Sequence, residues 1–179
     1  MNDLIFIGGV HGVGKTTFCN ELVNTYQIPT YSASRIISEL KKQNLPSNKL
    51  IPDIDVNQAF LLEGLKKIKS MRKVFILDGH FCLINENRTI SKIPETVFYQ
   101  IKPSACIVVM DTVSSIIERL EIRDNIDYES SFIEHFQDEE INHAVFLANT
   151  LNIPYHIYNQ STQSMSQLHN FITELGVIK

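Results

Sequence analysis

Short apolar segments alternate with amphipathic segments along the whole chain. The apolar segments are four to six residues long and rich in β-branched side chains, which is typical of strands buried on both faces of a sheet. They predict strands over residues 4–7, 28–31, 73–78, 105–110 and 155–158. The second of these contains Pro29, which confines it to a sheet edge or a strand end.

Between these strands, apolar residues recur at the three- and four-residue spacing of an amphipathic helix. The spacing predicts helices over residues 15–26, 33–43, 55–70, 94–101, 113–122, 132–151 and 163–175, with Ser32 as an N-cap and polar connections at 44–55, 85–92 and 123–131. Alternation of strands and helices predicts one α/β domain over residues 1–179. We expect a five-stranded parallel sheet with helices on both faces, in three layers.

The turn after the first strand has the sequence of a phosphate-binding loop. Residues 9–16 read GVHGVGKT, which fits the pattern GxxxxGK[ST]. Glycines let the backbone wrap an anion closely, and the start of the next helix adds free N–H groups and the positive end of its dipole. We expect the ATP phosphates to be bound by Gly9, Val10, His11, Gly12, Val13, Gly14, Lys15, Thr16 and Thr17.

Two of these loop residues and the acid at the end of one strand are the candidates for a catalytic cation and for the ligands of a metal ion. Lys15 supplies a cation for the β- and γ-phosphates, and the Thr16 hydroxyl is the expected Mg²⁺ ligand. The strand over 73–78 ends in Asp78, in the pattern of a Walker B acid that holds Mg²⁺ through water. Asp111 ends the strand over 105–110 in the same way. We favour Asp78, because the Gly79-His80 step after it frees backbone for a ligand.

Phosphoryl transfer between two anions needs positive charge around both of them. Arg35 lies one turn into the second helix and suits a substrate phosphate, although a solvated helix position explains it nearly as well. Arg119 and Arg123 are four residues apart, so they share one side of a helix and could clamp the transferred phosphate. The alternative is pairing with neighbouring acids. His80 either binds substrate or is a buried structural histidine.

The composition and net charge limit which kinds of binding partner and which cellular compartment we expect. The net charge is −4, which provides no general basic field for a nucleic-acid duplex or an anionic membrane. The three cysteines are far apart in sequence and are interpreted as small buried side chains in a reducing compartment. No apolar run has the length of a membrane span or a signal peptide. We therefore expect a cytoplasmic protein with a small-molecule substrate.

Together, these pieces resemble the P-loop nucleoside monophosphate kinases, and among them the short archaeal-type adenylate kinases and the adenylate-kinase-like ATPases. The matching stretches are IFIGGVHGVGKTT, SASR, VFILDGHF, ACIVVMD followed by IIERLEIRD, and EEINHAVFLANTLNIPYHIYN. The resemblance implies a P-loop NTPase fold with ATP and Mg²⁺ as cofactors. It also implies an acceptor-binding segment at about 31–70 with Ser32 and Arg35, and a short lid at about 119–131 with Arg119 and Arg123.

The resulting hypothesis is an ATP-dependent kinase of a nucleoside monophosphate or a related small nucleotide. Lys15, Arg119 and Arg123 would be catalytic, and Asp78 and His80 would also contact substrate. The chain departs from the family where Asn142-His143 replaces a common Asn-Arg step, and where DGHFCL carries no arginine. Two alternatives stay open. One is an ATPase that acts as a nucleotide-driven switch on a protein or RNA partner, and the other is a kinase of nucleic-acid 5′ ends.

Overall fold

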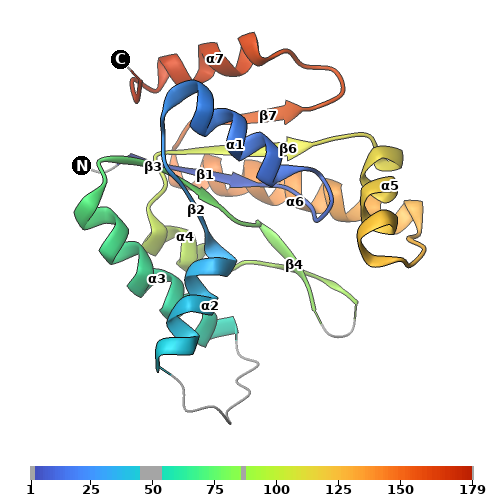
Figure 1. The fold of residues 1–179 in the computed structure, drawn as a ribbon, viewed down its shortest axis with the longest axis horizontal. Coiled ribbons are helices and arrows are strands. Elements are labelled where there is room, and N and C mark those ends of the chain that lie inside the picture. Colours follow the sequence, from blue (N-terminus) through green and yellow to red (C-terminus); the bar gives the residue numbers. More distant parts are fainter. Residues whose placement is uncertain (1–2, 45–53, 86–87, 179) are drawn as a thin grey trace.

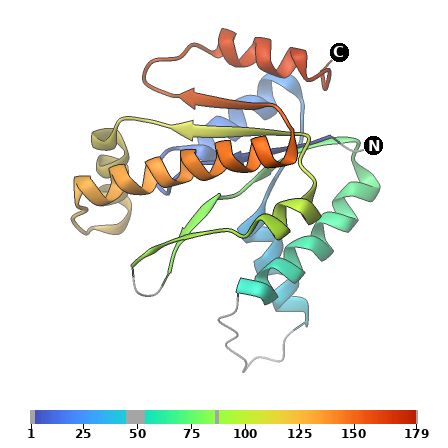
Figure 2. The same cartoon turned by 180° about the vertical axis from the view of Figure 1, so that it is seen from behind.

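The computed structural model describes residues 3–44, 54–85 and 88–178, and its centre is a twisted sheet with helices on both sides (Figures 1 and 2). The strands are β1 (Asp3–Gly8), β2 (Thr30–Ser32), β3 (Val74–Asp78), β4 (Cys82–Ile84), β5 (Ile90–Lys92), β6 (Ala105–Met110) and β7 (Tyr155–Asn159). The helices are α1 (Lys15–Tyr26), α2 (Ala33–Asn44), α3 (Ile54–Met71), α4 (Glu95–Ile101), α5 (Val113–Asp124), α6 (Ser130–Leu151) and α7 (Met165–Glu174).

The main sheet has five strands in the order β2-β3-β1-β6-β7, and every neighbouring pair is parallel. Strand β1 is central, with Ile7 opposite Asp78 of β3 and Gly8 opposite Val108 of β6. The short strand β2 lies at one edge, as the proline before it requires. The predicted five-stranded parallel sheet with helices on both faces is therefore confirmed.

Alternating side chains of β1 divide the core into two layers. Ile5 and Ile7 pack in a cluster with residues of α1 and α7, whereas Leu4 and Phe6 pack in a second cluster with residues of α2, α3, α4 and α6. All four side chains are buried, which explains why this strand is a continuous apolar run. The cysteines Cys19, Cys82 and Cys106 are also buried and free, as predicted. The carboxyl ends of the parallel strands share one edge of the sheet.

The structure differs from the prediction after β3. The segment 85–92 was expected to be a polar loop, but Ile90–Lys92 forms β5 and pairs with β4 in an antiparallel hairpin. Asn85 supports the turn, because its side-chain oxygen accepts the Thr89 N–H at 2.9 Å. A three-residue strand with one serine and one lysine carries too little apolar pattern to be recognised alone.

The connection predicted at 123–131 is also shorter than expected. Helix α5 continues to Asp124, and α6 begins at Ser130, so Asn125–Glu129 is the connection between them. Arg119 and Arg123 therefore both lie on a regular helix. Most of the connection predicted at 44–55 lies outside the described residues. Within the described ranges, no helix combines the length and the apolar character needed to cross a membrane.

Candidate active site

The phosphate-binding loop joins the end of β1 to the start of α1, in a conformation that needs glycine. Gly9 and Gly12 have φ angles of +149° and +78°, which side chains rarely adopt. A Cβ on Gly9 would lie 2.5 Å from the Val109 carbonyl oxygen, and one on Gly12 would lie 2.6 Å from Leu120 Cγ. Val10 and Val13 bury their side chains in the core. These two side chains therefore anchor the loop to the core, and the loop backbone faces the cavity.

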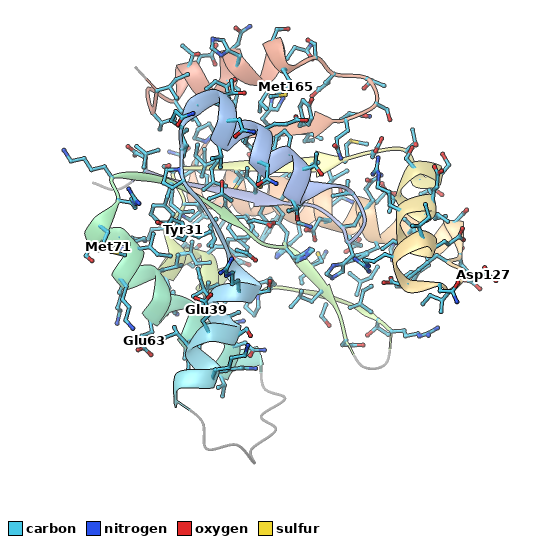
Figure 3. The ribbon with its side chains drawn as sticks, in the orientation of Figure 1. Tyr31, Glu39, Glu63, Met71, Asp127 and Met165 are labelled. Carbon is cyan, nitrogen blue, oxygen red and sulfur yellow. The ribbon has the colours of Figure 1, made fainter. Side chains whose placement is uncertain are left out.

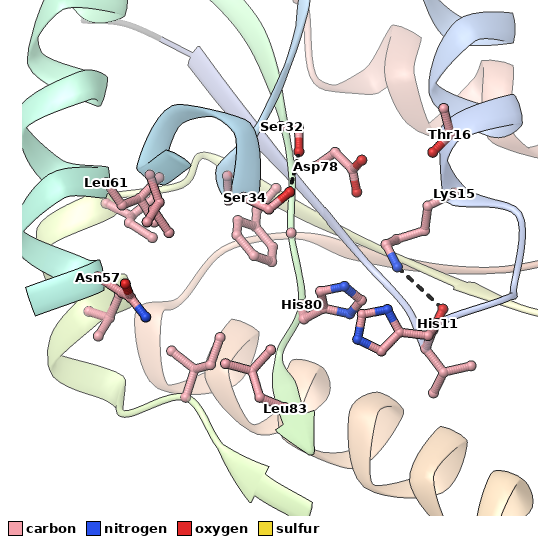
Figure 4. A pocket seen from close by; sticks show the side chains of 18 of the residues that line it. His11, Lys15, Thr16, Ser32, Ser34, Asn57, Leu61, Asp78, His80 and Leu83 are labelled. Atoms are coloured by element: carbon pink, nitrogen blue, oxygen red, sulfur yellow. Dashed lines mark hydrogen bonds between the residues drawn. The ribbon is translucent and has the colours of Figure 1, made fainter. Parts of the chain in front are cut away.

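The Lys15 side chain extends back along this loop, toward its first residues. Its Nζ donates hydrogen bonds to the carbonyl oxygens of Gly9 at 2.6 Å and Val10 at 3.3 Å. Figure 4 draws one hydrogen bond from Lys15 as a dashed line. Burial lowers the pKa of Lys15, while the carboxylates of Asp78 and Glu140 act in the opposite direction. The amine thus lies where it can contact an anion cradled by the loop.

Asp78 and Thr16 line the same cavity as Lys15. Burial raises the pKa of Asp78, and the positive charges of Lys15 and His80 partly offset this. The Asp78 carboxylate makes no hydrogen bond within the described part of the chain, and Thr16 is exposed. Both oxygens are hard donors of the kind that Mg²⁺ prefers. The described ranges contain no group of three or more His, Cys, Asp or Glu side chains that could hold a metal ion.

Asp111, the other acid at a strand end, is fully engaged within the protein. Its carboxylate accepts hydrogen bonds from Arg119 at 2.5 Å, from the Thr112 N–H at 2.8 Å and from the Ser161 hydroxyl. Burial alone would raise the pKa of Asp111, but these bonds outweigh it and hold the pKa below its usual value. Asp111 is not among the residues that line the cavity. Its geometry is that of a support for Arg119.

Arg119 links helix α5 to the phosphate-binding loop. Its Nη1 donates to the carbonyl oxygens of Gly12 at 3.1 Å and Val13 at 3.2 Å, while Nη2 is held by Asp111. Arg123, one turn further, lines the cavity and also pairs with Asp124 at 2.6 Å. The structure therefore brings both arginines to the cavity. For Arg123 it also shows the neighbouring-acid pairing that the sequence had left open.

Two histidines meet beside the lysine. The rings of His11 and His80 have centroids 4.3 Å apart (Figure 4). Burial among the cavity walls, with the nearby charges of His80, Lys15 and Arg123, lowers the pKa of His11 to about 4. His11 is therefore neutral at physiological pH. His80 Nδ1 lies 3.8 Å from Glu140 Oε1, beyond hydrogen-bond distance.

Glu140 is a site residue that the sequence interpretation missed. Its side chain is fully buried, and its carboxylate accepts the backbone N–H groups of Gly9 at 2.9 Å, Phe81 at 2.9 Å and Cys82 at 2.6 Å. Burial alone would raise the pKa of Glu140, but the interactions with His80 and the backbone donors hold it below its usual value. A signal existed, because Glu140 falls on the apolar face of the predicted long helix, four residues after Phe136. It ties α6 to both the phosphate-binding loop and the exit of β3.

Some predicted residues lie outside the cavity. Arg35 does not line it; its side chain is 81% exposed and pairs at 2.8 Å with Glu39 on α2. Glu39 is labelled on this helix in Figure 3. Thr17 is exposed and does not line the cavity either. Ser32 does line it, as the last residue of β2, and hydrogen-bonds to the Ser34 hydroxyl at 3.0 Å.

The cavity has a volume of about 610 Å³ and extends well beyond the phosphate-binding loop. We call the side formed by residues of β2, α2, α3 and the segment from β4 to α4 the far wall. Its polar members are Ser32, Ser34, Asn57 and Gln58, and its apolar members include Ile37, Leu61, Leu83, Ile93, Val97 and Phe98. Figure 4 shows Asp78 between this wall and the Lys15–Thr16 side. The cavity thus has room for a second group beside a bound phosphate chain.

Comparison with known proteins gives a family and a fold. A family model described as an AAA domain matches residues 8–137. A sugar kinase from Janibacter sp. HTCC2649 superimposes with a TM-score of 0.59 at 14% identity, covering 99% of this chain and 96% of that chain. An uncharacterized protein from Eubacterium ventriosum ATCC 27560 gives 0.53 at 14% identity, covering 97% of each chain. No curated protein matches.

A third solved structure, a protein with a provisional kinase assignment from Chloroflexus aurantiacus J-10-fl, gives a TM-score of 0.56 at 12% identity. The match covers 97% of this chain and 94% of that chain. At such low identities, the likeness establishes the fold alone. The five-stranded parallel sheet with its phosphate-binding loop is the fold of P-loop NTPase kinases. The narrower resemblance to adenylate kinases is not confirmed.

Proposed function

The chain belongs to the AAA-domain family, and from this membership we propose that it is an ATP-dependent phosphotransferase acting on a small nucleotide or nucleoside. The observation that carries the proposal is the extent of the cavity. Hydrolysis of ATP needs no second chamber beside the γ-phosphate, yet the cavity continues past Asp78 to the far wall. Its volume of about 610 Å³ falls within the range of small-molecule sites.

In the proposed reaction, the protein acts by positioning and electrostatics. Backbone N–H groups of the loop and the Lys15 amine hold the β- and γ-phosphates. An oxygen of the acceptor forms a bond to the γ-phosphorus while the bond to the β–γ bridging oxygen breaks, and ADP leaves with that electron pair. Arg119 and Arg123 neutralise charge on the transferred group, and no covalent enzyme intermediate is required.

The cavity also offers oxygen ligands for a metal ion. Thr16 directly, and Asp78 through water, would hold Mg²⁺, which neutralises charge on the ATP phosphates when bound. Two features support this assignment: both side chains line the cavity, and Asp78 is free of hydrogen bonds within the described residues. Asp111 is a poorer candidate, because its carboxylate is already taken by Arg119, Thr112 and Ser161.

The experiment that tests the proposal measures ADP formation from ATP with and without acceptors, and identifies the product by mass spectrometry. A phosphotransferase forms ADP faster when its acceptor is present and yields an equal amount of phosphorylated acceptor. Slow phosphate release that is indifferent to every acceptor would instead support the nucleotide-driven switch. Labelling of oligonucleotides alone would support a 5′-end kinase. The net charge of −4 weighs against that last outcome.

A further inference from the structure

The cavity is divided into two halves of different charge. It has three cationic residues within the ranges 3–44, 54–85 and 88–178. Lys15 begins α1 at the end of the phosphate-binding loop, and Arg119 and Arg123 lie on α5. Asp78 lies at the junction and is the one acid among the described residues that line the cavity. The far wall contributes no lysine or arginine from the part of the chain that the structure describes. Among the described residues, positive charge therefore lines the donor side alone.

Basic residues on nearby elements are directed elsewhere. Arg35 on α2 is exposed and pairs with Glu39. On α3, the Lys69 amine donates to the Ile101 carbonyl oxygen at 2.6 Å. Arg72 donates from Nε to the Tyr31 hydroxyl at 3.3 Å. None of the three is among the residues that line the cavity.

The two histidines do not replace the missing charge. His11 is neutral near pH 7, because its pKa is lowered to about 4. His80 Nδ1 faces the buried Glu140 carboxylate at 3.8 Å, so this ring lies beside a negative charge within the protein. A phosphate group on an acceptor would thus face Asp78, with no cation beside it among the residues that the structure describes. An unpaired charge in a partly buried site is strongly unfavourable.

The far wall suits an uncharged molecule instead. Ile37, Leu83 and Ile93 present apolar surface, and all three are half-buried. Asn57 adds a neutral amide to the same wall. Apolar walls with a few neutral hydrogen-bonding groups are typical of sites for heterocycles and similar bodies.

We infer that the acceptor is an uncharged molecule that carries a hydroxyl group on a largely apolar body, with a nucleoside as the best fit, and is not a nucleoside monophosphate. This inference rests on the proposed phosphotransferase function. The acceptor hydroxyl oxygen bonds to the γ-phosphorus, the bond to the bridging oxygen breaks, and ADP leaves. The hydroxyl proton is released to water once the new bond has formed.

The test compares matched pairs of acceptors that differ only in a phosphate. The pairs are the common nucleosides with their 5′-monophosphates, and hexoses with their 6-phosphates, each with ATP and Mg²⁺. We expect kcat/KM for the best neutral acceptor to exceed that of its phosphorylated partner by roughly a hundredfold, because the partner buries an unpaired charge. Equal or faster transfer to the phosphorylated member would overturn the inference and leave the proposed function intact. ADP formation without a phosphorylated product from any acceptor would overturn both.

A charge-addition variant tests the same inference from the protein side. Gln58→Arg places a cation on the far wall, and we expect it to reduce the preference for the neutral acceptor by about tenfold or more. Ala59→Arg is the matched control, because it adds the same charge to the same helix at an exposed position outside the cavity. A preference that stays the same in both variants, with both shown to be folded by circular dichroism, would contradict the inference.

Discussion

Lys15 is expected to be needed for activity but to contribute little to the stability of the fold. Its amine donates to the loop carbonyls of Gly9 and Val10, and burial disfavours its charge. We expect Lys15→Ala to lower ADP formation by roughly a hundredfold or more, because one preorganised donor to the phosphates is lost. The melting temperature should stay the same or rise slightly. Lys66→Ala, an exposed change on α3, is the control. Unchanged turnover in Lys15→Ala would refute the site.

Glu140 is expected to matter for stability more than for chemistry, because its carboxylate binds backbone N–H groups and does not line the cavity. In Glu140→Gln, the amide nitrogen must point a donor at one of the N–H groups of Gly9, Phe81 or Cys82. We expect a loss of about 2–3 kcal/mol in the free energy of unfolding, from leaving buried donors unpaired. Urea unfolding measures it. The control is Glu139→Gln, which removes only a partly exposed pair with Lys92 and should cost less than about 1 kcal/mol.

The same carboxylate predicts a pH dependence of stability. The pKa of Glu140 in the folded chain is held below its usual value, and in the unfolded chain it is about 4.3. Its stabilising contribution is therefore complete above the unfolded value and is lost as pH falls through the lower folded value. We expect the wild-type free energy of unfolding to fall more steeply below about pH 4 than that of Glu140→Gln. Parallel curves from urea titrations over this range would contradict the assignment.

At the scale of elements, the packing of α2 on α3 shapes the far wall. Gly64 of α3 lies against Ile36 of α2, and a Cβ there would come closer to Ile36 Cγ2 than real Cβ atoms do. Overpacking typically costs about 1–3 kcal/mol, against a gain of about 1 kcal/mol in helix propensity. We expect Gly64→Ala to destabilise the chain slightly and to raise the acceptor KM severalfold with little change in the ATP KM. The opposite KM pattern would argue against a far-wall acceptor site.

Elements could be predicted from the sequence where local pattern determines them. Apolar runs such as Leu4–Ile7 fixed the strands, Pro29 indicated an edge, and the glycine spacing identified the phosphate-binding loop. Strands β4 and β5 were both missed, because three-residue strands exist only through their pairing with each other. The local pattern also could not predict which way the Arg35 side chain points. Its position one turn into α2 is the same whether the side chain faces the cavity or pairs with Glu39.

At the scale of the whole molecule, the site depends on contacts between residues far apart in sequence. Glu140 accepts an N–H group from 131 residues away, and Arg119 reaches a loop carbonyl 107 residues away. No spacing rule encodes such pairs, so the sequence could name Arg119 as a candidate and could favour Asp78 over Asp111 only from the Gly79-His80 step. The tertiary fold adds that Asp111 is engaged by Arg119, while Asp78 lines the cavity.

Because β1, α1, β3 and α5 converge on one cavity, a bound nucleotide should stabilise the whole chain. A ligand at a hundred times its Kd adds about 2.7 kcal/mol to the free energy of unfolding, which raises the melting temperature by roughly 5–10 °C for a chain of this length. We expect ATP with Mg²⁺ to give such a shift in a thermal melt, and Lys15→Ala to abolish most of it. Removing Mg²⁺ with a chelator should reduce the shift, because Thr16 and Asp78 would then face the phosphates without the ion that joins them. If neither ATP nor GTP with Mg²⁺ moves the melting temperature, the loop does not bind nucleotide and the proposed chemistry has no donor.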